Sequence, residues 1–100
     1  MLLDSAVWRR FDEVVELPPP DDKARAEILK IKLRSVRTDI DLVAAAVRMD
    51  GFSAAEVEVV ALDAIRMMVR QMDKLVGERQ IAYGIERGEA RRLIVRTSQA

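Results

Sequence analysis

The chain has 100 residues, half of them apolar but only 4% aromatic, so one small domain with an aliphatic core is expected. Seventeen basic residues balance seventeen acidic ones, which gives no electrostatic reason to expect nucleic acid or an anionic membrane as a partner. The absence of cysteine and histidine excludes disulfides, thiolate metal sites and the commonest general base. No apolar run approaches a membrane span or a signal-peptide core, so a cytoplasmic location is expected.

The first part of the chain predicts a short helix followed by an isolated strand. Asp4 or Ser5 can cap a helix that continues through Arg9 or Arg10, because their side chains accept from free first-turn amides. The β-branched segment Val14–Leu17 predicts a strand that has no partner elsewhere in the sequence. A lone strand leaves backbone groups unpaired. The sheet that this strand joins is therefore expected in a longer parent protein or in another chain.

The three prolines Pro18–Pro20 mark the expected domain boundary, because they stop both helix and sheet pairing. An all-α domain of four helices is predicted in residues 21–100, and residues 1–20 belong to what precedes it. The expected helices run from Asp21 or Asp22 to about Arg34, from Asp39 or Asp41 to Gly51, from Ser53 to Gly77, and from about Ala82 to Thr97.

Each predicted helix has an apolar stripe that is expected to face the core. The spacing Ser53-Ala54-Ala55-Glu56 predicts a capping box at the start of the third helix. Apolar residues at Val59, Leu62 and Val69 widen the face of that helix. The stripes are Ala24, Ile28 and Ile31 with Leu29 and Leu33 beside them; Leu42, Ala45, Ala46 and Met49; Val57, Val60, Ala61, Ala64, Ile65, Met68 and Met72; and Ile85, Ala90, Leu93 and Ile94.

Two patterns have a structural interpretation from sequence alone. The methionines Met67, Met68 and Met72 have helical spacing, which favours core packing over an adaptable binding face. A basic patch near the end of the last helix is expected to be solvated, and the alternative is contact between neighbouring subunits; the patch comprises Arg91, Arg92 and Arg96.

The segment from Gly51 to Glu56, read Gly-Phe-Ser-Ala-Ala-Glu, resembles the Gly-Phe-Ser-Gly-Ala-Asp turn of AAA+ ATPases of the AAA branch. Here Ala54 replaces the usual glycine and Glu56 the usual aspartate. In that family the turn lies against the adenine and ribose of ATP. The resemblance therefore implies that Gly51, Ser53, Ala54 and Ala55 bind nucleotide, within a four-helix lid domain.

Residues 3–12, Leu-Asp-Ser-Ala-Val-Trp-Arg-Arg-Phe-Asp, resemble the end of the large domain of the same family. The uninterrupted Arg9-Arg10-Phe11 is similar to the katanin, spastin and ESCRT-disassembly branch and to many bacterial AAA proteins. The resemblance implies that Arg9 and Arg10 are arginine fingers, which stabilise charge on the γ-phosphate in a neighbouring subunit. It also implies an oligomer, usually a hexameric ring, that acts on a protein substrate.

The sequence contains no Gly-x-x-x-x-Gly-Lys-Ser/Thr loop and no strand ending in acidic residues to hold magnesium. We therefore expect a lid fragment that hydrolyses no ATP alone and binds no cofactor alone, whereas its parent protein uses ATP and Mg. The alternative is a free-standing helical interaction module that binds a partner helix through the face between Val57 and Met72. A small DNA-binding bundle is disfavoured by the balanced charge.

Overall fold

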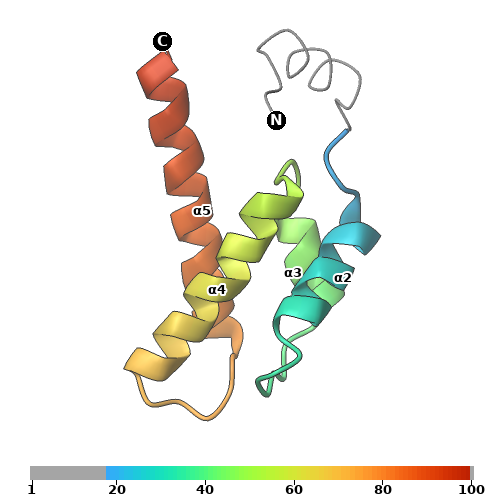
Figure 1. Cartoon of the computed structure of the whole chain (residues 1–100), viewed down its shortest axis with the longest axis vertical. Helices are drawn as coiled ribbons and strands as arrows, with labels where there is room; N and C mark the ends of the chain where they lie inside the picture. Colours follow the sequence, from blue (N-terminus) through green and yellow to red (C-terminus); the bar gives the residue numbers. More distant parts are fainter. Residues whose placement is uncertain (1–17, 100) are drawn as a thin grey trace, which may run out of the picture.

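The computed structural model describes residues 18–99, with residues 95–99 described by their backbone alone. Over this range the chain is all-α and forms no sheet, which confirms the predicted fold class. The helix and strand expected before Pro18 lie outside the described residues. The four described helices are α2 (Asp22–Lys32), α3 (Leu42–Arg48), α4 (Ala54–Arg70) and α5 (Glu78–Gln99), and Figure 1 shows α4 lying between α5 on one side and the α2–α3 pair on the other.

Short polar side chains start the first two described helices, as the sequence predicts. Asp21 Oδ1 accepts from the Ala24 amide at 2.8 Å, and Asp41 Oδ1 accepts from the Ala44 amide at 3.2 Å. Each bond satisfies an amide that has no partner within its own helix. Gly51 follows α3 with a φ of +85°, a left-handed conformation that glycine adopts without strain.

The buried line of α2 differs from the predicted stripe. Arg25, Leu29 and Leu33 are buried at four-residue spacing, whereas Ile31 is 53% exposed. Because the first buried position is an arginine, the spacing of the aliphatic residues alone predicted the adjacent face of the helix, which contains Ile31. The core that these residues join consists of Leu29, Leu33, Ala45, Met49, Phe52, Val57, Val60, Ala61, Ala64, Val76, Ile81 and Ile85.

Helix α4 ends earlier than predicted, at Arg70, and Gly77 lies immediately before α5. Met72 has a φ of +56° and is 89% exposed, so it neither continues the helix nor joins the buried stripe. The Asp73 amide donates to Met68 O at 2.9 Å, which closes the helix end in a Schellman arrangement. At the next helix, the Gly77 amide donates to Gln80 Oε1 at 2.8 Å.

Helix α5 packs on α4 through glycines that look like helix breakers in the sequence. A Cβ atom added at Gly84 would lie 2.6 Å from Val60 O, and one added at Gly88 would lie 2.8 Å from Phe52 Cε2. The two helices approach closely because these positions lack side chains. The α5 stripe was predicted only in part, since Ile85 is buried but Ala90, Leu93 and Ile94 are exposed. None of the described helices is both long enough and apolar enough to cross a membrane.

Candidate functional site

The turn between α3 and α4 gathers the residues that the sequence assigned to nucleotide binding. Gly51, Ser53, Ala54 and Ala55 are all exposed, whereas Phe52 between them is 2% exposed and belongs to the core. The buried phenyl ring anchors the turn to the bundle. The chain thus presents a fixed stretch of backbone that only small side chains cover, and we call residues 51–55 the α4 turn.

The predicted capping box is present and fixes the hydrogen bonding of this turn. The Glu56 amide donates to Ser53 Oγ at 3.1 Å, and the Ser53 amide donates to Glu56 Oε1 at 2.8 Å. No described group accepts from the amides of Ala54 and Ala55, which are first-turn donors of α4. The α4 turn therefore offers two free donors at the positive end of a helix.

Arg92 of α5 packs against the α4 turn. Its Nε atom lies 3.4 Å from Glu56 Oε2, and its guanidinium carbon lies 5.0 Å from the centre of the Phe52 ring. Its terminal nitrogens would be 3.5 and 3.6 Å from a Cβ atom added at Gly51. The sequence placed Arg92 in a solvated patch, but its side chain is 29% exposed and covers one side of the turn.

The chemistry of the α4 turn suits the base and sugar of a nucleotide but provides no ligands for the magnesium ion that accompanies ATP. The alanine methyl groups and free amides of Ala54 and Ala55 suit the flat face and polar edge of a base and sugar, because little side-chain bulk blocks approach. Magnesium requires oxygen ligands, usually carboxylates with water. Among the described residues, no group of three or more acidic side chains lies close enough to hold a metal ion.

The structure therefore brings together four of the six residues predicted for the site. Gly51, Ser53, Ala54 and Ala55 share one exposed turn, and their contact with nucleotide stays a prediction. Arg9 and Arg10 lie outside the described residues, so their predicted role as arginine fingers also stays a prediction. Sequence reasoning missed Arg92, because no local spacing relates a residue of α5 to the start of α4.

Comparison with known proteins finds AAA family ATPases, although no family model matches the chain. An uncharacterised AAA family ATPase, y4kL, from Sinorhizobium fredii is 37% identical over 90 residues, which cover 90% of this chain and 27% of the relative. An ATP-dependent zinc metalloprotease FtsH from Kosmotoga olearia is 38% identical over 90 residues, covering 86% and 14%. A proteasome-activating nucleotidase from Aeropyrum pernix is 33% identical over 93 residues, covering 89% and 23%.

The three relatives have different names, but each matches this chain over 86% or more of its length. Over most of its length the homologues of this chain are AAA family ATPases, as its sequence motifs indicated. It spans 27%, 14% and 23% of the lengths of these three relatives, so it matches a region of such proteins.

Proposed function

We propose that this chain is the lid region of an AAA family ATPase. In this proposal residues 21–100 form the helical lid domain, and residues 1–20 are the end of the large ATPase domain with the proline connector. The observation that carries it is the α4 turn, an exposed backbone segment closed by a capping box, in a chain related to ATPases over most of its length. The parent protein would use ATP and Mg to remodel a protein substrate as an oligomer.

The proposed contribution of the α4 turn is to hold the adenine and ribose of ATP bound by the same subunit. Ala54 and Ala55 provide apolar contact and free amides, while Gly51 and Ser53 keep the backbone of the turn accessible. Arg92 fixes Glu56 and stacks on Phe52, so the turn keeps its shape without a ligand. ATP supplies the γ-phosphate for hydrolysis, and these residues orient the other end of the molecule.

The proposed contribution of residues 1–20 is to the active site of a neighbouring subunit. Arg9 and Arg10 carry planar guanidinium groups that stay charged at every physiological pH and donate hydrogen bonds in a fork. Such a group stabilises the charge that develops on a transferring phosphoryl group. A finger that acts in a neighbouring subunit requires assembly, which agrees with the oligomeric parent proposed here.

A chimera tests both contributions in one protein. The matching region of the Sinorhizobium fredii relative is replaced by this chain, and ATP binding and hydrolysis are measured in the assembled protein. Arg10→Ala should lower turnover by roughly a thousandfold or more while ATP binding is retained. Ala54→Phe should weaken ATP binding by about tenfold, since the added ring occupies the space for the base.

The control is Arg34→Ala, which removes the same kind of side chain from an exposed position after α2. It should leave both binding and turnover unchanged. If Arg10→Ala left turnover unchanged in the assembled ring, the finger assignment would be wrong. If Ala54→Phe bound ATP as tightly as the parent chimera, the adenine assignment would be wrong.

The structure weakens the alternative hypothesis of a free-standing interaction module. The face from Val57 to Met72 was expected to receive a partner helix, but Val57 and Val60 are buried by the helices of this chain itself. Three large apolar side chains of α4 are more than one-third exposed: Val59 at 37%, Leu62 at 44% and Val69 at 64%.

A further inference from the structure

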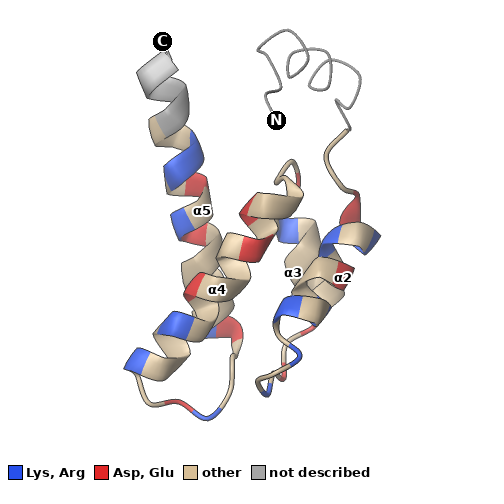
Figure 2. Cartoon of the chain, viewed as in Figure 1, with Lys and Arg blue, Asp and Glu red and all other residues tan. Residues whose placement is uncertain are grey.

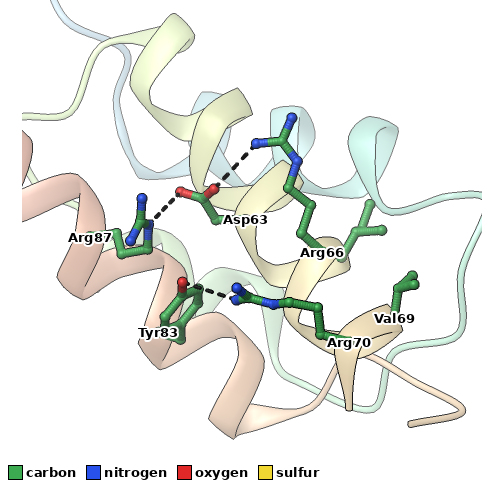
Figure 3. A pocket seen from close by; sticks show the side chains of 7 residues that line it. Asp63, Arg66, Val69, Arg70, Tyr83 and Arg87 are labelled. Carbon is green, nitrogen blue, oxygen red and sulfur yellow. Dashed lines mark hydrogen bonds and ion pairs between the residues drawn. The ribbon is translucent and has the colours of Figure 1, made fainter. Parts of the chain in front are cut away.

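A cleft of about 460 Å³ lies between the C-terminal half of α4 and the N-terminal half of α5, away from the α4 turn. Figure 3 shows its side chains converging from both helices, and Figure 2 shows basic residues on the last turns of α4 and along α5. We call it the arginine cleft. It is lined by Asp63, Ile65, Arg66, Val69, Arg70, Tyr83 and Arg87.

A single buried carboxylate, Asp63, anchors the cleft. Its side chain is 6% exposed, and Arg91 donates to Oδ2 at 2.5 Å while the Nε atom of Arg87 lies 3.6 Å from the same oxygen. Arg66 approaches Oδ1 at 3.8 Å with a side chain that is 66% exposed. Three arginines thus share one negative charge, and Arg66 lies farthest from it.

A fourth arginine, Arg70, contacts Tyr83, the tyrosine that lines the cleft. Arg70 donates to Tyr83 Oη at 3.0 Å, and the guanidinium carbons of Arg70 and Arg87 each lie 5.6 Å from the ring centre. This hydrogen bond, with the positive charges of both arginines, holds the pKa of Tyr83 below its ordinary value. Counting Asp63 and the four arginines around it, the cluster has a formal excess of three positive charges.

The floor of the cleft is apolar and open. Val69 is 64% exposed and Ile65 is half-buried, while Leu62 one turn earlier is 44% exposed. Arginine and tyrosine are among the side chains most enriched at the energetic centre of protein interfaces, and here they lie beside an exposed apolar patch. The cleft therefore combines an apolar contact with an unbalanced positive charge at its rim.

We propose that the arginine cleft docks a segment of a partner protein in which an apolar side chain is flanked by carboxylates. The apolar side chain would pack on Ile65 and Val69, and the carboxylates would accept from the guanidinium groups of Arg66 and Arg70. A peptide is favoured over a free phosphate because the lining is mainly apolar and the Asp63 carboxylate opposes a compact dianion. This inference does not depend on the proposed role of the α4 turn.

The test is a titration of the full chain, labelled with ¹⁵N, with the capped peptide acetyl-Asp-Glu-Leu-Val-Glu-Asp-amide in about 50 mM salt. We expect saturable shifts of the arginine Nε resonances of the cleft and of the Tyr83 ring. The matched neutral peptide, with Asn and Gln in place of the acids, should cause none. Raising the salt should weaken the binding of the acidic peptide, since its charges are exposed.

Two variants locate the binding and keep the closer partners of the buried carboxylate in place. Arg66→Gln and Arg70→Gln should each weaken binding of the acidic peptide about threefold, because each removes one exposed ionic contact. Arg34→Gln makes the same change of charge outside the cleft and should bind as the unmodified chain does. Arg87 and Arg91 are left in place, because their loss would leave Asp63 without its closer partners.

Four results would overturn the proposal. These are no saturation by the acidic peptide up to about 5 mM, equal binding of the neutral peptide, equal weakening by Arg34→Gln, and tighter binding of inorganic phosphate than of the acidic peptide. The last result would identify a small-anion site instead of a docking surface. Because the readout is peptide binding by the isolated chain, it is independent of the ATPase test.

Discussion

Replacing Arg25 by methionine removes a buried cation that joins the proline connector to the bundle. The Arg25 side chain is 2% exposed, its Nε atom donates to Ala46 O at 2.8 Å, and its Nη1 atom donates to Pro20 O at 2.7 Å. The other terminal nitrogen pairs with Asp22. One side chain therefore ties the end of the connector, the start of α2 and the end of α3 together.

The expected loss can be worked out from the state of each acceptor after substitution. A hydrogen bond from an ionised donor contributes about 1.5–3 kcal/mol where both partners are shielded from water. Ala46 O keeps the Met49 amide at 3.1 Å as a second donor, and half-buried Pro20 can be hydrated, so neither carbonyl bears the full cost. Methionine preserves most of the stem packing. We expect Arg25→Met to lower the free energy of unfolding by about 2 kcal/mol.

Urea unfolding measures this loss, and an unchanged m value would show that the same surface is exposed. The matched control is Lys23→Met, which removes an exposed cation from the same helix and should change stability by less than about 0.5 kcal/mol. Some buried charges can be replaced by apolar residues without loss, because their desolvation is costly. An Arg25→Met variant as stable as the unmodified chain would place Arg25 in that group and refute the stabilising effect expected from its hydrogen bonds.

Three further predictions concern single positions. Gly84→Ala should destabilise the chain by about 1–2 kcal/mol in a thermal melt, because the clash with Val60 O outweighs the gain in helix propensity; a higher melting temperature would contradict this. Met72→Gly should stabilise by about 1 kcal/mol in urea, because glycine relieves the left-handed conformation of an exposed residue; no gain would contradict it. Tyr83, the one tyrosine, should titrate by phenolate absorbance below its ordinary pKa of 10.0, and Arg70→Gln should raise that pKa. Because the folded-state pKa is depressed, the associated stability is fully present above pH 10.0 and is lost as pH falls through the lowered pKa; a pKa of 10.0 or higher would contradict it.

Features that depend on neighbours along the chain could be predicted from the sequence. Asp21, Asp41 and Ser53 each accept from an amide within three residues, so the sequence placed the third helix start at Ser53 and the other two within one or two residues. The left-handed Gly51 and the small residues after it are likewise local. The α4 turn is one continuous segment, so its resemblance to the turn of AAA proteins is enough to predict it as a candidate site.

Features that depend on distant packing could not be predicted in the same way. Gly84 lowers helix propensity, yet it lies inside α5 because Val60 approaches it across the helix interface. Met72 fits the apolar spacing of α4, yet the chain turns away before it. Arg92 was expected in a solvated basic patch, and Arg25 was not among the residues predicted to be buried in α2, because the partners of both side chains come from other elements of the fold.

Helix α4 carries residues of both candidate surfaces, one near its start and the other near its end, so each surface can be altered by its own substitutions. Its first turn holds the exposed residues Ala54 and Ala55, and its last turns hold Arg66 and Arg70 of the arginine cleft. The nearest residues of the two surfaces on this helix, Ala55 and Asp63, are about 12 Å apart at 1.5 Å per residue, and the two surfaces share no residue. Substitutions at the exposed ends of α4 should therefore affect one surface at a time. A change at the glycine contacts of α5 moves the whole helix pair and should disturb both.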